Sequence, residues 1–522
     1  MSHLYDKLQK YGESDYYPYH MPGHKRRLYG NLPEEIAKMD ITEIDGFDNL
    51  HQAEGILLEL QQKAASIYGA DESFYLVNGS TGGILSAISA AVPFGGHLLM
   101  ARNSHKSAYH AAYLRNLRLS YLYPEWITGY DVYEAITPEQ VEEALERETD
   151  IDAVYIVSPT YEGRIADIQG IAKVVHAKGI PLIVDEAHGA HLGMAKGFAK
   201  NSSRLGADIV INSVHKTLPA MTQSAILHVN GGRINRQQLR KFLHIYQTSS
   251  PSYILMASID NALNLVETKG EEIFSTFYRR YCRMLECLVK CKRLQILSNI
   301  EEIESGAQDV GKLVISTRNT HLSGQELYDI LLERYHLQLE MAAGTYCLAM
   351  FTVGDDDDGY ERMTRALLEL DYEIAKMQDD DQVTRKTVDY SSLIEDKAYG
   401  KDACRSSLLC GNTKVERPTC IIPIAQAWEL NTKDVPLRES VGQPVGEFIN
   451  LYPPGIPILV PGEVMNEEIV QLLEEYLRHG LTVQGVKVVR TDTPINVDGN
   501  KHADGQNDRC VHYIKIVHHA ER

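Results

Sequence analysis

Two short apolar runs in this sequence end in residues that can do chemistry. The run from Ile180 ends in Asp185-Glu-Ala-His188, and the run from Ala207 leads to His215 and Lys216. Such runs are typical of buried strands in a parallel sheet, where ligands bind just beyond the carboxyl ends of the strands. We therefore expect the carboxylate of Asp185 and the amine of Lys216 to face the same crevice, with both histidines beside them.

A carboxylate and a lysine in one crevice suit a site for pyridoxal 5'-phosphate. The lysine forms an imine with the aldehyde of this cofactor, and the carboxylate keeps the ring nitrogen protonated. An ion pair at about 4 Å is worth roughly 4 kcal/mol at an effective dielectric of about 20. This energy keeps the ring nitrogen protonated across several pH units. We predict that Lys216 and Asp185 fill these two roles.

The segment Asn78-Gly-Ser-Thr-Gly-Gly83 lies between a predicted strand and a predicted helix. Free amides and the helix dipole attract an anion there, so we expect a cofactor phosphate near Ser80, Thr81 and Gly82. Turns of this composition end many strands, and an ordinary turn is the alternative. His105 follows the next strand and could lay its ring against a flat cofactor, although a lone histidine is more often a core or surface residue.

Asp185 also has two metal-binding interpretations. The segment 184–188 resembles the acidic box of helicases, which requires a phosphate-binding loop elsewhere. The nearest candidate, residues 306–313, has Leu313 in place of the required Ser or Thr and precedes a predicted strand. A zinc site from Asp185, His188 and His191 matches no established spacing. We reject both interpretations and predict no metal site.

Strand-like and helical segments alternate through the first half of the chain. We expect strands at 73–77, 97–101, 119–123, 153–158, 180–185, 207–212 and 224–229. Helical stretches are expected between them, including one that Thr137-Pro-Glu-Gln140 opens as a capping box and a long one over 252–294. This alternation predicts an α/β fold with a mostly parallel sheet covered by helices on both faces.

Composition narrows the class of protein. The chain has 522 residues and a net charge of −19, which argues against a nucleic-acid partner. Its eight cysteines form no repeated C-x-x-C pair, so we expect reduced thiols and no disulfide or zinc framework. We see neither a signal peptide nor an apolar run of about 18 residues. These features predict a cytoplasmic enzyme without membrane spans.

Changes in pattern divide the chain into five parts. We predict an N-terminal arm at 1–50, a cofactor-binding large domain at 51–270, a small α/β domain at 271–378, a linker or surface excursion at 379–420, and a C-terminal α+β domain at 421–522.

Motifs along most of the chain resemble those of the ornithine, lysine and arginine decarboxylases. The motifs are Met21-Pro-Gly-His-Lys25, Asn78-Gly-Ser-Thr81, Asn103-Ser-His-Lys-Ser107, Asp185-Glu-Ala-His188, Ser213-Val-His-Lys216 with Thr222-Gln-Ser224, Thr248-Ser-Ser-Pro251, and Tyr452-Pro-Pro-Gly-Ile-Pro457 with Pro461-Gly-Glu463. The resemblance implies the fold-type-I (aspartate aminotransferase-like) fold of pyridoxal phosphate enzymes. It also implies the short form of the family, because no receiver-like wing domain fits before Met21.

The resemblance also implies roles for individual residues. Lys216 would be the Schiff-base lysine, Asp185 the partner of the ring nitrogen, and His105 the residue stacked on the ring. His188 would lie near the imine and the substrate carboxylate. The residues expected to hold the phosphate are Ser80, Thr81, Gly82, Ser213 and His215. The resemblance is weaker at Thr248 and Ser249, where we expect phosphate-site or substrate contacts across a two-fold interface.

The implied reaction is decarboxylation of a basic amino acid for polyamine metabolism. Similarity to short-form members favours arginine, giving agmatine, with lysine to cadaverine next and ornithine to putrescine as a further candidate. We expect Glu463 to pair with the distal cation of the substrate, although it could equally cap the following helix. We also expect a homodimer at least.

Two other functions share parts of this pattern. An aminotransferase or a β-eliminating lyase of the same fold uses the same lysine and aspartate. The segment 452–463 and the lack of an arginine placed for a second carboxylate argue against both. A catalytically silent regulator is a third candidate, against which the intact Lys216, Asp185 and His105 argue.

Overall fold

We describe the fold from a computed structural model of the chain. The described residues are 4–18, 21–22, 24–26, 34–127, 130–384, 417–451, 455–478, 481–491 and 509–518. Most of the predicted linker at 379–420, part of the arm, and Tyr452 to Pro454 of a family motif lie outside the described residues.

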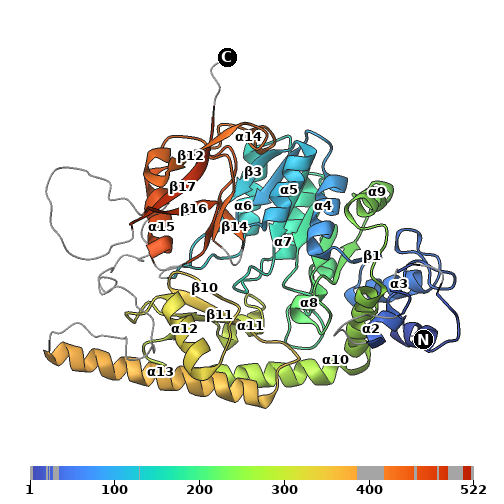
Figure 1. Ribbon diagram of the computed structural model, residues 1–522, viewed down its shortest axis with the longest axis horizontal. Helices are drawn as coiled ribbons and strands as arrows, with labels where there is room; N and C mark the ends of the chain where they lie inside the picture. The colour runs from blue at the N-terminus through green and yellow to red at the C-terminus, as the bar shows by residue number, and fades with distance from the viewer. Residues whose placement is uncertain are drawn as a thin grey trace.

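A seven-stranded sheet forms the centre of the molecule (Figure 1). Its order is β1-β7-β6-β5-β4-β2-β3, and β7 runs antiparallel to both of its neighbours while the inner strands are parallel. The strands are β1 (Glu72–Leu76), β2 (His97–Ala101), β3 (Arg118–Leu122), β4 (Ala153–Val157), β5 (Leu182–Asp185), β6 (Ile209–Asn212) and β7 (Ala225–Val229). The predicted mostly parallel sheet is confirmed.

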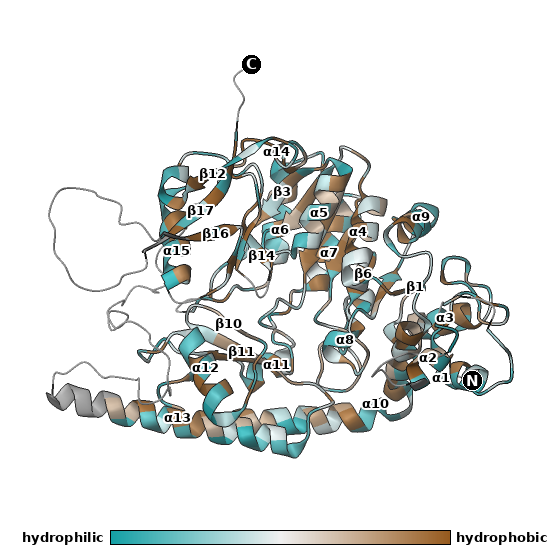
Figure 2. Ribbon diagram, viewed as in Figure 1, coloured by the Kyte–Doolittle hydropathy of each residue, from teal (hydrophilic) through white to brown (hydrophobic). Residues whose placement is uncertain are grey.

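The sheet is apolar on both faces because helices cover both. Successive residues of β2 belong to different cores: Leu98 and Met100 pack into one, whereas Leu99 and Ala101 pack into the other. Hydropathy colouring shows brown strands between helices that turn teal faces outward (Figure 2). This two-sided burial explains why the strands read as continuous apolar runs rather than as alternating ones.

Helix ends in this domain follow local capping rules. Thr137 and Gln140 form the predicted capping box with Pro138 in the first turn, and Gly69 ends its helix with φ +72°. One start was wrong: the helix after β1 begins at Gly79, so the glycine-rich segment forms the first helical turn itself. The helices are α3 (Ile56–Tyr68), α4 (Gly79–Ala91), α5 (Lys106–Arg115), α6 (Pro138–Arg147), α7 (Ile168–Ala177), α8 (Val214–Thr217) and α9 (Arg236–Tyr246), with 3-10 turns at Leu50–Gln52 and Ser202–Leu205.

A long helix, α10 (Tyr253–Leu288), leads from the sheet into a second layer of structure along the base of Figure 1. The N-terminal helices α1 (Leu4–Gly12) and α2 (Glu34–Met39) contact it, and the backbone N–H of Leu4 donates to Asp260 Oδ2 at 3.0 Å. The N-terminal segment is therefore anchored on the large domain.

The second unit has an antiparallel sheet of order β10-β11-β9-β8. Its elements are β8 (Gln295–Ile296), α11 (Ile300–Ser305), β9 (Lys312–Ser316), α12 (Gly324–Tyr335), β10 (Met341–Ala342), β11 (Tyr346–Met350) and α13 (Asp357–Thr384). The apolar stripe of α13 packs into the same core as α10, including Met363, Leu367 and Ile374. The last helix runs several residues beyond the predicted end of the small domain.

A C-terminal unit with two small sheets lies beside the large domain and above the small domain in Figure 1. Its elements are α14 (Ile424–Ala427), β12 (Thr432–Pro436), a 3-10 turn (Leu437–Ser440), β13 (Ile449–Leu451), β14 (Ile456–Leu459), α15 (Glu467–Arg478), β15 (Val483–Gln484), β16 (Val486–Thr491) and β17 (Arg509–Val517). Trp428 and Phe448 contact His110 on α5 with ring centroids 5.7 Å away in each case. These contacts attach the C-terminal unit to the helix that follows β2.

Across the ranges described above, no helix is both long and apolar enough to cross a lipid bilayer.

Candidate active site

Asp185 and Lys216 stand at the carboxyl ends of neighbouring parallel strands, as the sequence predicts. Asp185 is the last residue of β5, is 3% exposed, and accepts hydrogen bonds from Tyr155 Oη at 2.9 Å and from the Ala187 N–H at 3.1 Å. Burial raises the pKa of Asp185, while the charge of Lys216 and the bond from Tyr155 act in the opposite direction. The carboxylate is thus held rigidly but has little solvent to stabilise its charge.

Lys216 lies on the short helix α8 just after β6. Its Nζ is 3.0 Å from Nε2 of His188, and burial lowers its pKa, while Asp185 and Glu340 favour its charged form. A lysine with a lowered pKa is a better nucleophile towards an aldehyde, because the neutral amine is the reactive form. The structure therefore brings Lys216, Asp185 and His188 together.

His105 is the N-cap residue of α5 and follows β2, which pairs with β4 in the sheet. Its Nδ1 accepts from the Ser107 N–H at 3.2 Å and lies 2.8 Å from Ser107 Oγ, which fixes the ring. Burial lowers the pKa of His105 to about 4, and the charge of Lys216 is the next cause. The ring is therefore neutral at physiological pH, and it lies close enough to Lys216 for the charge of the lysine to lower the pKa of His105.

The predicted phosphate-binding residues lie on two segments that one loop joins. Ser80, Thr81 and Gly82 are in the first turn of α4, and the Gly79 N–H donates to Gln223 O at 3.0 Å. His215 Nδ1 donates to the neighbouring Ser224 O at 2.8 Å. The loop containing Gln223 and Ser224 thus links the first turn of α4 to the lysine segment.

Unpartnered polar atoms remain at this place. Ser213 Oγ and Thr217 Oγ1 are buried with no hydrogen-bond partner among the described residues, which is costly unless a ligand supplies one. The first turn of α4 adds free backbone N–H groups that favour an anion. Together with the Asp185 carboxylate, the Lys216 amine and the neutral His105 ring, this donor set fits pyridoxal phosphate.

Tyr161 and Lys312 were not predicted as site residues, and both contact His188, while the unpredicted Glu162 acts on Lys312 through its charge. Tyr161 contacts the His188 ring edge-on with centroids 4.7 Å apart, and Lys312 Nζ is 2.8 Å from His188 Nδ1. Glu162 accepts from Tyr346 Oη at 2.8 Å. The sequence predicts Lys312 as the first residue of a strand and as part of a rejected phosphate-binding loop, because no local pattern shows that the start of β9 (Lys312–Ser316) lies beside His188.

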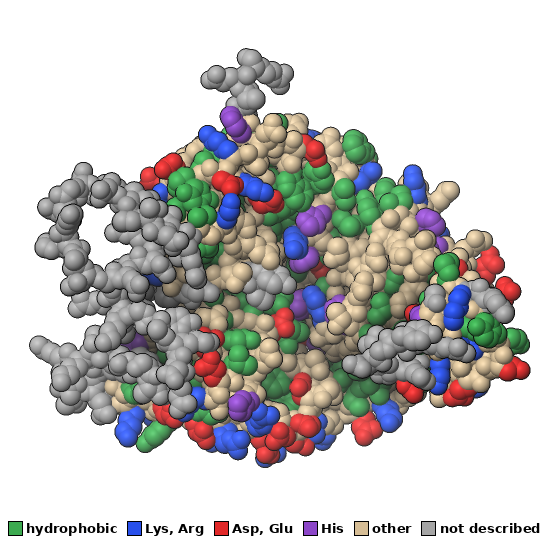
Figure 3. All heavy atoms as spheres, viewed as in Figure 1, with side chains coloured by type: hydrophobic (Ala, Val, Ile, Leu, Met, Phe, Trp, Pro, Cys, Tyr) green, Lys and Arg blue, Asp and Glu red, His purple; other side chains and the backbone are tan. Residues whose placement is uncertain are grey.

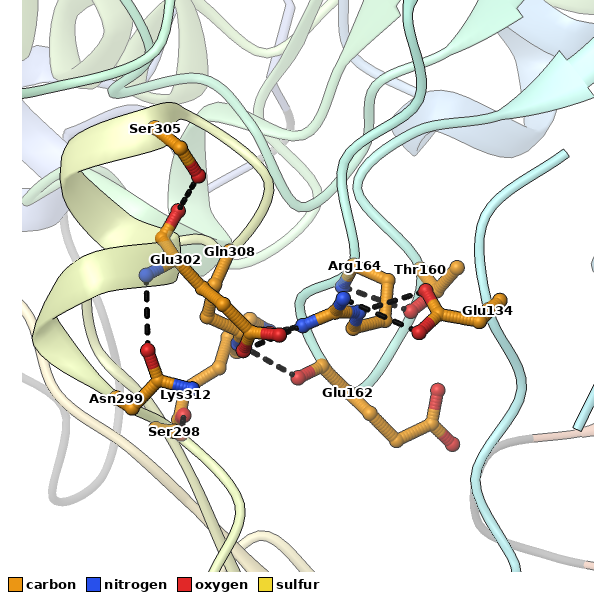
Figure 4. Close-up of polar contacts among 10 residues, drawn as sticks. All are labelled: Glu134, Thr160, Glu162, Arg164, Ser298, Asn299, Glu302, Ser305, Gln308 and Lys312. Atoms are coloured by element: carbon orange, nitrogen blue, oxygen red, sulfur yellow. Dashed lines mark hydrogen bonds and ion pairs between the residues drawn. The ribbon is translucent and has the colours of Figure 1, made fainter. Parts of the chain in front are cut away.

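Arg164 anchors the loop that carries Tyr161 and Glu162. Its guanidinium bonds Glu134 Oε2 at 2.9 Å, Glu302 Oε2 at 2.8 Å and Gln308 Oε1 at 3.2 Å, and Gln308 in turn donates to the backbone oxygen of Glu162 (Figure 4). Bidentate arginine contacts of this kind are geometrically specific. The loop after β4 is therefore held against the small domain.

Figure 3 shows histidine and basic side chains gathered near the middle of one face, between the C-terminal unit and the small domain. Residues 2–324 match the sequence profile "Orn/Lys/Arg decarboxylase, major domain", and residues 423–485 match the C-terminal domain of the same enzymes. The chain belongs to the Orn/Lys/Arg decarboxylase family.

Relatives within this family agree in length with the short form. Arginine decarboxylase of Bacillus subtilis is 29% identical over 92% of this chain and 95% of its own length. That of Halalkalibacterium halodurans is 30% identical over 90% and 91%. Constitutive lysine decarboxylase of Escherichia coli is 23% identical over 85% of this chain but 70% of its own length.

The fold agrees with that of solved decarboxylases. The crystal structure of lysine decarboxylase from Francisella novicida matches with a TM-score of 0.79 at 19% identity, covering 99% of this chain and 81% of that one. The fold-type-I prediction is confirmed, as is decarboxylation of a basic amino acid by a pyridoxal phosphate-dependent enzyme of this family.

Glu463 lies in a different environment from the one expected for a substrate-binding carboxylate. Its side chain is fully buried, pairs with Arg102 Nη2 at 2.9 Å, and accepts from the Val460 N–H at 2.9 Å. Arg102 also donates to the backbone oxygen of Pro457 at 2.7 Å. The ion pair joins the C-terminal unit to the large domain, and Asn466 rather than Glu463 bonds the Ile469 N–H in the first turn of α15.

Proposed function

We propose that this enzyme decarboxylates arginine to agmatine, with lysine and ornithine as the alternative substrates. The cluster of the buried Asp185 and His188 with the half-buried Lys216 carries the catalytic part of the proposal. Support for arginine comes from relatives named arginine decarboxylase, which match over nearly the whole of both chains, whereas the lysine decarboxylases match at lower identity.

In this proposal Lys216, Asp185, His105 and the first turn of α4 hold pyridoxal phosphate, with Ser213 and His215 at its phosphate. The cofactor supplies an electron sink for the bond to the carboxylate of the substrate. The Asp185 carboxylate keeps the ring nitrogen protonated, and the neutral His105 ring restricts the ring plane. Lys216 would hold the cofactor aldehyde, and His188 would hold a proton beside it.

We propose Glu340 as the acidic group that pairs with the distal cation. Its carboxylate is exposed and accepts a hydrogen bond from Tyr161 Oη. Burial lowers the pKa of both Lys216 and Lys312, and the charge of Glu340 opposes this shift in each, so its charge acts on the site. Among the described residues no lysine or arginine forms an ion pair with Glu340, which leaves its charge available to a guanidinium or ammonium group.

We further propose a homodimer or a larger homo-oligomer, in the cytoplasm, with Thr248 and Ser249 at the interface. Both residues are exposed, and Thr248 O accepts from His51 Nε2 at 2.8 Å, which fixes this irregular segment on the surface. Light scattering tests the assembly, and a fully active monomer would contradict it.

One experiment tests the substrate. The holoenzyme is incubated separately with arginine, lysine and ornithine, and the amine products are identified by mass. Agmatine as the main product supports the proposal, while cadaverine or putrescine would change the substrate. If a keto acid accumulates and no amine forms, this chain catalyses transamination and the proposed decarboxylation is wrong.

A further inference from the structure

His188 lies between two lysines. Lys216 Nζ is 3.0 Å from its Nε2, and Lys312 Nζ is 2.8 Å from its Nδ1. His188 is 7% exposed and Lys312 is 1% exposed. Both ring nitrogens therefore make their hydrogen bonds to amines inside the protein.

The chemistry of imidazole limits how these contacts can be made. A neutral ring has one N–H donor and one acceptor nitrogen, whereas an ammonium group only donates. Two ammonium groups cannot both bond to a neutral ring, and a protonated ring would turn two N–H donors towards two cations. Burial, followed by Lys216 and Lys312, lowers the pKa of His188 well below its usual value, so the ring is neutral. One of the two lysines must then be an uncharged amine that accepts.

The chemical role of Lys216 identifies which lysine keeps its charge, because the surroundings act on both lysines alike. Burial lowers the pKa of Lys312 to about 8, with Asp309, Glu340 and Glu162 opposing it and Lys216 adding to it, and burial also lowers the pKa of Lys216, with Asp185 and Glu340 opposing it. Lys216 must lose its proton to attack an aldehyde, so it is the lysine that accepts from the ring. Lys312 is consequently the donor to Nδ1, and Nε2 carries the ring proton.

We propose that Lys312 is a positioning residue that fixes His188 in the tautomer protonated on Nε2, with this N–H directed at the Lys216 side of the site. This inference rests on the proposed roles of Lys216 and His188. Once Lys216 is engaged by the cofactor, the Nε2–H of His188 is the proton that the chain presents to the substrate. Without Lys312, the ring is free to turn its lone pair to that side.

Close packing keeps Lys312 in place. Gly163 has φ +96°, and a Cβ at this position would come within 2.8 Å of Lys312 Cβ, so only glycine allows this approach. Ser298 Oγ donates to the backbone oxygen of Lys312, and Lys312 Nζ is 5.6 Å from the centre of the Tyr161 ring. Figure 4 shows Lys312 between the Ser298 segment and the loop of Glu162.

Other charged groups around His188 do not compete for its ring nitrogens. His105 and His191 lower its pKa only through their charge, after the two lysines. His191 Nε2 is bonded to Asp309 Oδ1 at 2.7 Å, which keeps that carboxylate beside Lys312. The carboxylates of Asp309, Glu162 and Glu340 act on Lys312 rather than on the ring.

The test is the tautomer of His188 in the full-length chain, measured by NMR of protein labelled with ¹⁵N at histidine, with and without added pyridoxal phosphate. Comparison with His188→Gln assigns the signals. The wild type should show Nε2 protonated and Nδ1 as acceptor. Lys312→Met should give a mixture or the opposite tautomer, and Lys312→Arg should restore the wild-type pattern.

Two further measurements keep the test decisive if Lys312→Met does not fold. Raising the pH of the wild type through about 8 should change the tautomer in the same direction, because a neutral Lys312 amine can accept a hydrogen bond from Nδ1–H and no longer selects one tautomer. In the holoenzyme, Lys312→Met should lower kcat about tenfold with little change in KM, and move the acidic limb of the kcat profile up by about one pH unit, since a like charge near His188 is removed.

Lys63 provides the matched control. It is a buried lysine paired with Glu267 at 3.0 Å, and Lys63→Met should leave both the tautomer and the pH profile unchanged. A tautomer that is identical in the wild type, in Lys312→Met and across this pH range would overturn the inference. The tautomer is read without turnover, so this outcome is distinct from failure of arginine as the substrate.

Discussion

Tyr155 Oη donates a hydrogen bond to Asp185 Oδ2 at 2.9 Å and so links strands β4 and β5 directly beneath the proposed cofactor site. Burial raises the pKa of Tyr155 well above its ordinary value, so the hydroxyl keeps its proton and acts only as a donor towards the carboxylate. The bond favours the ionised form of Asp185, which is the form needed beside a protonated ring nitrogen.

Tyr155→Phe should therefore weaken the binding of pyridoxal phosphate. A hydrogen bond to a charged group contributes about 1.5–3 kcal/mol, which corresponds to a rise of roughly tenfold to a hundredfold in the dissociation constant. Titration of the apoenzyme with the cofactor, followed by absorbance, measures this. Tyr68→Phe is the control, because Tyr68 Oη donates to the backbone oxygen of Ala190 and not to Asp185. Unchanged affinity in Tyr155→Phe would contradict the role.

Lys216→Ala should abolish both the visible absorption band of the lysine-bound cofactor and the release of carbon dioxide, because Lys216 supplies the amine beside His188 Nε2 at the proposed cofactor site. Spectroscopy and trapping of carbon dioxide measure the two effects, while thermal unfolding checks that the variant is folded. Turnover that persists in this variant would remove Lys216 from its proposed role.

Glu340→Gln should raise KM for arginine, since it removes the charge from a contact worth roughly 1.5–3 kcal/mol, or about tenfold to a hundredfold. The absorption band of the cofactor should not change, because the substitution keeps an acceptor for Tyr161 Oη. Glu301→Gln, another exposed carboxylate in the small domain, is the control. An unchanged KM would mean that a residue other than Glu340 pairs with the distal cation of the substrate.

Removing one partner of the Arg102–Glu463 pair should destabilise the fold. Arg102→Met leaves a buried carboxylate without its cation, a change that costs about 3–5 kcal/mol. Arg438→Met, at the exposed pair with Glu474, should cost less than about 1 kcal/mol and serves as the control in denaturant unfolding. If Glu463→Gln raises KM without loss of stability, the original substrate role of Glu463 is supported instead.

His228 should make the stability depend on acid. Burial lowers its pKa from 6.5 to about 3, so the unfolded chain takes up this proton first as the pH falls. The neutral His228 ring contributes its full stabilisation when the pH is above the pKa of 6.5 that the residue has in the unfolded chain. This stabilisation declines as the pH falls towards 3, by about 2 kcal/mol between pH 7 and 5. The free energy of unfolding of His228→Gln should fall between pH 7 and pH 5 by about 2 kcal/mol less than that of the wild type. Denaturant unfolding at both pH values measures this, and an equal fall in the two proteins would contradict the role of His228.

The sequence by itself determined the family, the fold class and the order of the strands along the chain. These features follow from local signals: apolar runs of strand length, capping residues such as Thr137 and Gln140, and polar residues placed directly after a strand. Asp185 and Lys216 could be paired in advance because the ends of neighbouring parallel strands always meet at one edge of a sheet.

Only the tertiary structure decided what surrounds His188 and where Glu463 points. Lys312 and Glu340 lie far from Lys216 along the chain and reach the site through the packing of an antiparallel sheet against the loop of Gly163, which no local pattern encodes. Glu463 likewise pairs with Arg102 across the contact between the C-terminal unit and the large domain. Side chains that meet across separately folded units depend on how those units pack, and periodicity within each unit carries no information about that packing.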